Sequence, residues 1–142
     1  MSFDSVYGIA ASAMNAQTVR LNTVASNLAN ADSAAGSSAG VYQARKPVFA
    51  ALYQDGTFLS GVGKGGARVQ ILDVIEAGRD AQQRYEPGNP LADADGYVYY
   101  PDVNVIEETA DMMSATRSFE TSVEVLNRVT SMQMSLLRLG DV

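Results

Sequence analysis

Two glycine- or aspartate-containing stretches have residue types that could do chemistry. Residues 61–66, GVGKGG, fit the G-x-G-x-x-G spacing that cradles a dinucleotide. That fingerprint must follow a strand and open a helix, whereas strand-type sequence follows here. Asp93, Asp95 and Gly96 resemble the middle of a calcium-binding loop, but the first ligand position would be Leu91, whose side chain cannot bind calcium. The sequence therefore predicts a flexible hairpin loop at 61–66 and a simple turn at 93–96.

The remaining candidate for chemistry is an acidic cluster formed by Glu107, Glu108 and Asp111. Acids at the start of a helix interact favourably with the helix dipole, so we interpret the cluster as a solvated helix face. The chain has no His and no Cys. This excludes thiolate zinc sites, imidazole ligands and Ser-His or Cys-His nucleophile pairs. We predict no catalytic residue, no metal site and no cofactor, and favour an assembly subunit over an enzyme.

The composition indicates contacts with protein rather than with nucleic acid. Ten basic and sixteen acidic residues give a net charge of −6, whereas phosphate binding needs clustered Lys and Arg. Charged residues make up 18 % of the chain, below the roughly 25 % of typical domains, so part of the surface is expected to meet protein. No run approaches the ~18 apolar residues of a membrane span. The first residues, MSFDSVYGIAASAMNAQ, lack the basic start of a cleavable secretory signal.

Residues 3–31 have the seven-residue repeat of a coiled-coil helix. One set of repeat positions holds larger side chains and the other is mostly small: Tyr7, Met14, Leu21 and Leu28, and then Phe3, Ala10, Gln17, Val24 and Ala31. Ala, Gln and Met make a thin seam, and an isolated helix of this quality is marginal in water. We therefore expect this helix to need a partner.

A second, longer helix is predicted over residues 103–139. Pro101-Asp102 is a start signal, no Gly or Pro interrupts the helix, and Gly140 is a suitable C-cap. Its apolar repeat consists of Val105, Met112, Phe119 and Leu126, with Ala115, Val123, Val129 and Leu136 beside it, and the last turns add Val125, Met132 and Leu139. Such a rod cannot fold back on itself, so its apolar stripe must be covered by the first helix, by other chains, or by both.

The sequence between the helices changes to strand-type patterns. Asp55-Gly56 separates two apolar runs and is typical of a hairpin turn, and residues 66–77 are rich in β-branched side chains. Residues 79–104 are expected to be mostly extended, with turns at Pro87-Gly88 and Asp95-Gly96. The predicted fold class is mainly α with a small β region. Its expected segments are an N-terminal helix (1–33), a flexible Ala/Ser/Gly-rich linker (34–44), a small β or extended domain (45–100) and a C-terminal helix (101–142).

Three segments resemble the axial proteins of the bacterial flagellum. YEPGNPLADADGYVYYPDVNVIEETADMMSATRSFETSVEVLN (85–127) resembles the C-terminal signature of proximal-rod proteins, and SNLANADS (26–33) is similar to a motif shared by rod and hook proteins. VYQARKPVF (41–49) is similar to the segment that follows that motif. The residues that carry the resemblance are Asn27, Asn30, Tyr85, Pro87, Gly88, Gly96, Tyr97, Pro101 and Asn104.

The resemblance implies a structural subunit of the basal-body rod, the drive shaft that transmits motor torque. It implies a periplasmic location, passage through the flagellar type III export apparatus without cleavage, and terminal helices that pair and pack into a helical tube. The implied partners are copies of the same protein and other proximal and distal rod proteins. The alternative from another class is a cytosolic coiled-coil adaptor or export chaperone that only binds such subunits.

Two short segments each have two possible roles. Phe49-Ala-Ala-Leu-Tyr53 is similar to the Phe-led segment that the export gate recognises in rod and hook proteins, and it equally fits a strand whose Phe49 and Tyr53 simply pack. Tyr97 and Tyr99 should share one face of an extended segment. They would cover either the terminal helices or an adjacent subunit, or else the β region of their own chain.

Overall fold

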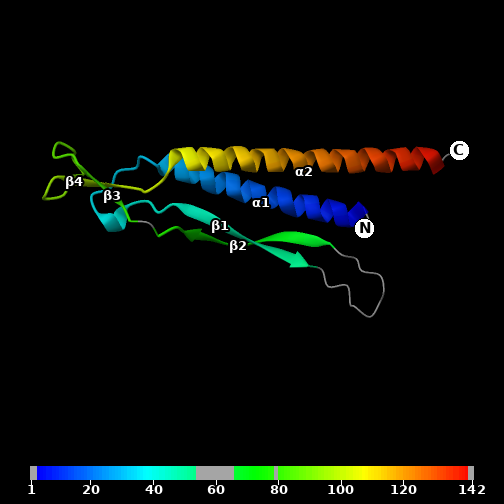
Figure 1. Cartoon of the computed structure of the whole chain (residues 1–142), viewed down its shortest axis with the longest axis horizontal. Helices are drawn as coiled ribbons and strands as arrows, with labels where there is room; N and C mark the ends of the chain where they lie inside the picture. The colour runs from blue at the N-terminus through cyan, green and yellow to red at the C-terminus, as the bar shows by residue number, and fades with distance from the viewer. Residues whose placement is uncertain (1–2, 54–65, 79, 141–142) are drawn as a thin grey trace. The chain divides into compact units, whose positions relative to one another are not determined.

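The computed structural model describes residues 3–53, 66–78 and 80–140 (Figure 1). The elements in chain order are α1 (Phe3–Asn30), a 3-10 turn η1 (Ser38–Gly40), β1 (Arg45–Tyr53), β2 (Ala67–Glu76), β3 (Gln82–Tyr85), β4 (Tyr97–Tyr100) and α2 (Val105–Gly140). Two long helices with a small antiparallel β region between them confirm the predicted fold class. The predicted turn at Asp55-Gly56 and nearly all of the 61–66 loop lie outside the described residues.

The chain forms two compact units, and each contains part of both helices. Unit 1 comprises residues 1–19, 48–73 and 114–142, and unit 2 comprises residues 20–47 and 74–113. Strand β1 pairs with β2 in one two-stranded sheet, and β3 pairs with β4 in another. None of the described helices contains a stretch long and apolar enough to cross a membrane.

Unit 1 is built on small side chains that allow close approach. Ala10 and Ala16 of α1 and Ala115 and Val129 of α2 are its buried apolar residues. The start of β2 lies against α1, where the Val69 N–H donates to Ser12 Oγ at 3.2 Å. The Arg68 guanidinium lies so near Gly8 that a Cβ there would be 2.9 Å from it.

Unit 2 contains the last turns of α1, the first turns of α2 and the β3–β4 pair. Its buried apolar residues are Val24, Ala31, Val41 and Val98. The β3–β4 register is antiparallel and runs from Gln82 opposite Tyr100 to Tyr85 opposite Tyr97. Two turns join these strands, one at Pro87-Gly88 and one before Tyr97.

The Ala/Ser/Gly-rich segment after α1 makes defined backbone contacts within unit 2. Ala35 forms a bridge with Tyr99, with N–H to oxygen distances of 2.8 and 3.0 Å in the two directions. A single 3-10 turn, Ser38–Gly40, follows. The flexibility of this linker and the four proposed segment boundaries stay predictions.

The start of α2 differs from the predicted start. The side-chain Oδ1 of Asn104 accepts the N–H groups of Ile106 at 3.1 Å and Glu107 at 3.3 Å, which makes Asn104 the N-cap. Asp102 instead accepts a hydrogen bond from the Gln82 side chain at 2.9 Å. The prediction that Pro101-Asp102 starts the helix at residue 103 is therefore wrong by two residues. At the other end, Gly140 is the last residue of α2.

The inward stripe of α2 is spaced by alternating steps of four and three residues, as in a coiled coil. The side chains of this stripe are buried or half-buried, and they are Glu108, Met112, Ala115, Phe119, Ser122, Leu126, Val129 and Gln133. The heptad pattern thus extends through a position that holds a carboxylate.

Candidate assembly surfaces

A buried asparagine organises the polar contacts of unit 2. Asn27 is only 1 % exposed. Its Nδ2 donates to the Arg45 carbonyl at 2.8 Å and to Glu108 Oε2 at 3.1 Å, and its Oδ1 accepts the Tyr42 hydroxyl at 2.9 Å and the Arg45 N–H at 2.8 Å. Both donors and both acceptor positions of the amide are used. This one side chain therefore connects the end of α1, the start of β1 and the first turn of α2.

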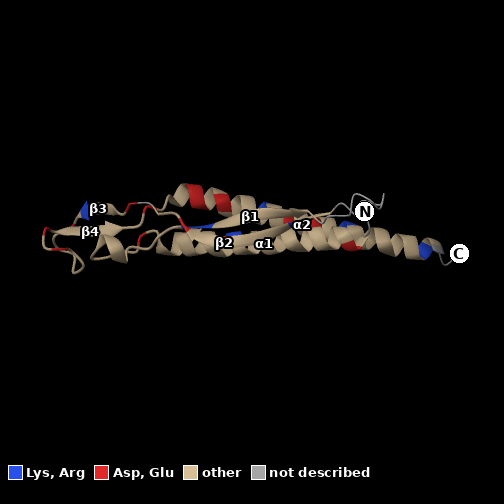
Figure 2. Ribbon diagram, turned by 90° about the horizontal axis from the view of Figure 1, so that it is seen from below, with Lys and Arg blue, Asp and Glu red and all other residues tan. Residues whose placement is uncertain are grey.

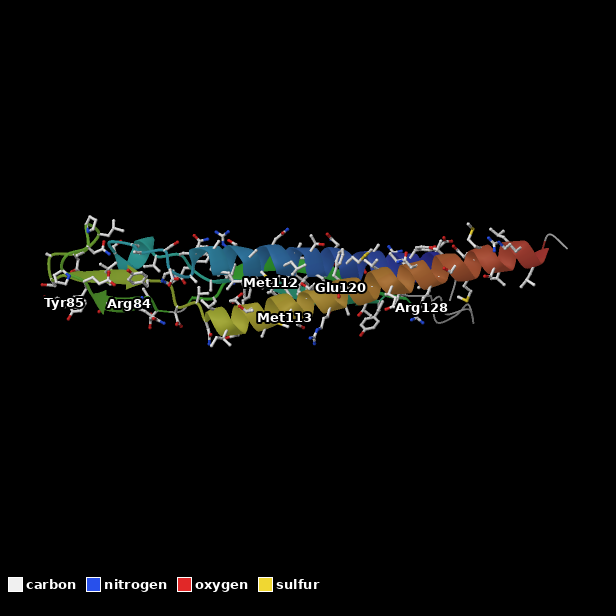
Figure 3. All side chains as sticks on the ribbon, turned by 90° about the horizontal axis from the view of Figure 1, so that it is seen from above. Arg84, Tyr85, Met112, Met113, Glu120 and Arg128 are labelled. Atoms are coloured by element: carbon white, nitrogen blue, oxygen red, sulfur yellow. The ribbon has the colours of Figure 1, made fainter. Side chains whose placement is uncertain are left out.

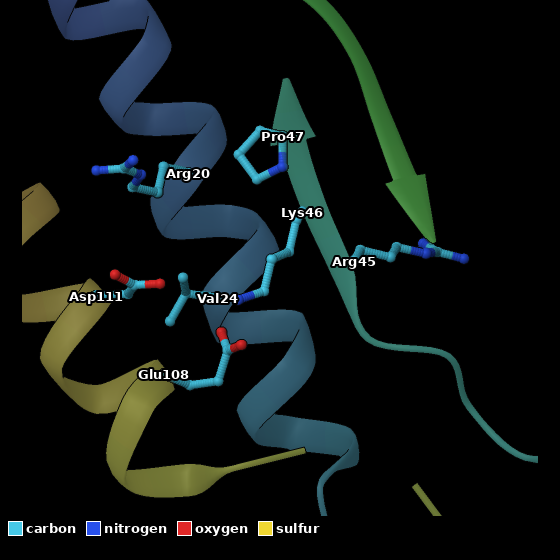
Figure 4. Close-up of a pocket in the computed structure, with 7 residues that line it drawn as sticks. All are labelled: Arg20, Val24, Arg45, Lys46, Pro47, Glu108 and Asp111. Atoms are coloured by element: carbon cyan, nitrogen blue, oxygen red, sulfur yellow. The ribbon is translucent and has the colours of Figure 1, made fainter. Parts of the chain in front are cut away.

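Glu108 is 4 % exposed, and with Asp111 it lines a pocket of about 90 Å³ in unit 2 (Figure 4). The other lining residues are Arg20 and Val24 of α1, and Arg45, Lys46 and Pro47 of β1. Figure 4 shows Arg45 extending away from the pocket toward β2, consistent with its 3.8 Å ion pair with Glu76. Lys46 pairs with Glu107 at 3.0 Å. Both pairs are solvent-exposed and contribute little to stability.

The interpretation of Glu107, Glu108 and Asp111 as a solvated face is wrong for Glu108. Figure 2 shows acidic residues at the start of α2, and a helix dipole favours acids there whether or not they are solvated. Glu108 precedes Ala115 by one heptad, and Ala115 is fully buried. That spacing is the sequence signal that would have placed Glu108 inside the helix pair.

The β3–β4 pair carries four tyrosines, Tyr85 on β3 and Tyr97, Tyr99 and Tyr100 on β4. Figure 3 labels Arg84 and Tyr85, the last two residues of β3. Tyr85 and Tyr97 make an edge-to-face contact with ring centroids 5.4 Å apart. The Arg84 guanidinium lies over the Tyr100 ring at 4.4 Å. Desolvation, followed by the hydrogen bond to Glu86, raises the pKa of Tyr100 above its usual value. Tyr97 and Tyr85 remain 39 % and 65 % exposed, so this aromatic pair is an available contact surface.

Asp93 fixes the turn that precedes β4, as the turn prediction for this stretch requires. Its Oδ1 accepts the N–H groups of Asp95 at 3.0 Å and Tyr97 at 2.8 Å, and its Oδ2 accepts the Tyr99 hydroxyl at 3.1 Å. The pKa of Asp93 is lowered, mainly by the hydrogen bond from the Tyr97 N–H. Desolvation acts in the opposite direction and is the smaller effect. The same carboxylate raises the pKa of Tyr99.

Gly96 closes this turn in a conformation that favours glycine. Its φ is +85°, and a Cβ there would lie 2.9 Å from Cε2 of Tyr85 and 3.3 Å from Cβ of Pro87. Both the backbone and the neighbouring rings therefore require a residue without a side chain.

In unit 1, polar groups also bridge the two helices. The Tyr7 hydroxyl donates to Gln133 Oε1 at 3.0 Å and lies 2.8 Å from Thr130 Oγ1. Beyond this contact, Phe3, Gln133, Leu136 and Leu137 line an open groove of about 450 Å³. Because Phe3 lies four residues before Tyr7 while Leu137 lies beyond Gln133, the two helix segments of this unit run antiparallel.

Large apolar side chains remain exposed on the last turns of α2 and on the β1–β2 sheet. On α2 they are Val125, Met132, Met134, Leu136, Leu137 and Leu139. On the strands of unit 1 they are Leu52, Tyr53, Val69 and Leu72. Apolar side chains that gather on one element in this way mark surfaces for protein contacts.

The residues predicted to pack in the assembly differ in exposure, and their role in assembly stays a prediction. Val24 and Val129 are buried, Val105 and Leu136 are exposed, and the others are half-buried: Tyr7, Met14, Leu21, Leu28, Met112, Phe119, Val123 and Leu126. Met112 and the exposed Met113 occupy successive positions of α2 in Figure 3. Val105 and Leu136 are therefore available to a neighbouring chain.

The residues of the expected family motif also differ in exposure. Asn27 and Pro101 are buried, Asn30 and Gly96 are half-buried, and the rest are exposed: Tyr85, Pro87, Gly88, Tyr97 and Asn104. Of the expected export segment, Phe49 is half-buried and Tyr53 is 78 % exposed. Sequence reasoning missed the partners of Asn27, which are Tyr42, Arg45 and Glu108.

Paired long helices with apolar side chains left exposed are typical of helical proteins that assemble with other chains. Two family models match the chain: "Flagella basal body rod protein" at residues 9–36 and "Flagellar basal body rod FlgEFG protein C-terminal" at residues 94–139. Curated relatives named "Flagellar basal-body rod protein FlgC" are similar over nearly the whole chain. The protein of Escherichia coli O157:H7 is 46 % identical over 99 % of this chain and 100 % of its own length. That of Salmonella typhimurium LT2 is 44 % identical over the same shares, and that of Bacillus subtilis 168 is 33 % identical over 93 % and 94 %.

The chain belongs to the FlgC family of flagellar basal-body rod proteins. This is a family of structural proteins, so the expectation of a rod subunit rather than an enzyme is confirmed. The comparisons give no support to the cytosolic adaptor or export chaperone.

Proposed function

We propose that the chain is a subunit of the proximal, periplasmic part of the rod, where it polymerises with copies of itself and with other proximal and distal rod proteins. The observation that carries this proposal is the exposed apolar side of the last turns of α2. Met132, Leu136 and Leu139 are 52 %, 52 % and 74 % exposed. Removing such side chains from water is favourable at about 25 cal/mol per Å², so a neighbouring subunit would stabilise this surface.

The contacts of a helical tube are heterologous, meaning that different patches of identical chains meet. Such contacts do not close, and they build a filament. A chain with one apolar surface at the end of α2 and another on the β1–β2 sheet has two different patches of the kind that such an assembly requires.

The test replaces apolar side chains that contact other subunits without disturbing the helix pair. Met132→Gln with Leu139→Gln changes two exposed positions one heptad apart. Ser131→Gln with Arg138→Gln is the matched control, because these residues are also exposed and one heptad apart. We expect the first variant to be exported and stable but absent from isolated basal bodies, with motility lost, and the control to assemble normally. Normal assembly of both variants would contradict the proposed role of this surface.

Assembly also requires that the packed side of the helices be intact. Leu126 is half-buried in the stripe that faces α1, and Leu126→Ala should destabilise the subunit by at most about 2–5 kcal/mol, the cost of full burial. The expected outcome is reduced rod assembly and motility at low expression. Unchanged motility at that expression level would count against this packing role.

We further propose that the flagellar type III export apparatus recognises the segment from Phe49 to Tyr53. The exposed Tyr53 and half-buried Phe49 lie on β1, so the same residues also fit a purely structural role once the chain is folded. Secretion of Phe49→Ala is measured in cells that lack rod assembly, so that polymer stability has no influence. Secretion at the wild-type level would leave Phe49 with the structural role alone.

A further inference from the structure

The polar pair Asn27 and Glu108 is unusual because it occupies the packed interior of unit 2. Both side chains are almost completely buried, at 1 % and 4 % exposed, and they are joined by a hydrogen bond of 3.1 Å. Glu108 is the first member of the inward stripe of α2, and its successors at the two following positions are Met112 and Ala115. A polar group at a core position of a helix pair is a known way to fix register at some cost in stability.

The Asn27 amide is held in one orientation by groups outside α2. Its Oδ1 accepts the Tyr42 hydroxyl and the Arg45 N–H, and one Nδ2 hydrogen is donated to the Arg45 carbonyl. The remaining N–H is the one that points at Glu108. Because rotating the amide would break the other three contacts, this donor can be satisfied only by an acceptor on α2.

Among the inward positions one heptad apart, Glu108 is the residue that supplies such an acceptor. A slip of one heptad would bring Ala115 or Pro101 to its place. Neither side chain has a carboxylate or amide oxygen, so each heptad slip leaves a buried donor unsatisfied. The apolar part of the stripe has no comparable preference, because Met, Ala and Leu fit neighbouring heptads with similar contacts.

We propose that Asn27 and Glu108 are the register-determining pair of this subunit, which selects one alignment of α1 with α2 from several that the apolar stripe alone would allow. The pair is a specificity device and not the main source of stability. This inference does not depend on the proposed assembly function, because all of its contacts lie within unit 2 of one chain.

Register can be measured directly because the chain contains no cysteine. One cysteine replaces Arg20 of α1, and a second is placed at Asp111, Ser118 or Val125 of α2. Arg20 and Asp111 line the same pocket of unit 2, and the three residues of α2 follow one another at heptad spacing. A short bismaleimide is added to cells, and the internally cross-linked chain is detected by its altered gel mobility. Successive partner positions report alignments that differ by about 10 Å along the helix axis.

The decisive variant makes the pair apolar, with Asn27→Leu and Glu108→Leu together. With Asn27 and Glu108 unchanged we expect the Asp111 position to cross-link roughly tenfold or more above the other two, since an unsatisfied buried donor disfavours a state by about that factor. In the apolar variant the cross-links should spread over two or three positions. Glu108→Gln, which keeps an acceptor oxygen for Asn27, is the matched control and should retain the single strong position.

A single strong cross-link at Asp111 in the apolar variant would overturn the proposal. Loss of the variant chain, or no cross-link at any position, would also overturn it, because the pair would then be needed for folding itself and not for choosing a register. A chain with Asn27 and Glu108 unchanged that shows the single Asp111 cross-link but is missing from basal bodies would refute the assembly function and leave this inference standing.

Discussion

Asn27→Ala tests whether the buried amide holds unit 2 together. The substitution removes all four hydrogen bonds of the side chain and leaves Glu108 without its Asn27 donor. A buried polar group without a partner costs about 1–3 kcal/mol, and more when it is charged. The Arg45 N–H and carbonyl that bond Asn27 are part-buried and lose this partner as well. The expected loss in the free energy of unfolding is therefore about 2–4 kcal/mol, mostly from Glu108.

Asn30→Ala is the matched control, because it makes the same change of residue type in the same motif. Asn30 donates to the Ser26 carbonyl at 2.8 Å and accepts only a long 3.4 Å bond from Ser33. The first contact is part-buried and the second is exposed, and both are local, so the control should lose about 0.5–1.5 kcal/mol. Asn27 lies inside α1 and Asn30 is its last residue, so any gain in helix propensity on changing Asn to Ala is at least as large for Asn27. The difference between the two variants is therefore a lower bound on the contribution of the network.

The assay for both variants is urea unfolding of the purified chain, followed by circular dichroism at a fixed concentration of sucrose, which strengthens apolar burial. A difference between the two variants below about 0.5 kcal/mol would refute the reasoning, since the network contribution would then be no larger than that of an ordinary exposed contact. An unchanged dependence of unfolding free energy on urea concentration is needed to attribute the difference to stability alone.

Three further outcomes are expected. The free chain without sucrose should show much less helix than α1 and α2 contain, because each helix lacks part of its cover; a demonstrably monomeric chain with full helical signal would contradict this. Gly96→Ala should lower the free energy of unfolding by about 1–3 kcal/mol, since its positive φ and the nearby Tyr85 ring both oppose a side chain, and an unchanged urea midpoint would count against that. The lowered pKa of Asp93 means that its ionised form stabilises the turn above the ordinary carboxyl pKa, and that this stabilisation is lost as the pH falls through the lower folded pKa. The Tyr97 amide signal should therefore shift in acid, and the shift should be absent in Asp93→Asn.

Much of the fold could be predicted from local sequence patterns. The heptad repeat predicted the end of α1 to within one residue of Asn30. The run rich in β-branched residues predicted both ends of β2 to within one residue. Period and propensity act over short stretches, so a single sequence contains them. The start of α2 was less accurate, because Asp102 and Asn104 are both good capping residues and only the contact of Asp102 with Gln82 decides between them.

The polar centre of unit 2 could not be predicted in the same way. Asn27, Arg45 and Glu108 come from three separate segments and meet only in the folded chain. Locally, an acid in the first turn of a helix looks the same whether it is solvated or buried, because the helix dipole favours it in both cases. Only the heptad phase of α2 distinguishes Glu108 from its exposed neighbour Glu107.

The apolar residues of α2 form two sets, one packed and one exposed, which the sequence alone does not separate. The stripe that faces α1 includes Leu126 and Val129, while a second set, with Val125 and Met132 one residue before inward positions, stays exposed. A one-residue step turns a side chain by about 100° around the helix, so two apolar faces with the same heptad spacing overlap in sequence. One partner helix covers only one of these faces. The second face continues to the exposed Leu139, one heptad after Met132, and the proposed rod assembly would supply the chain that covers it.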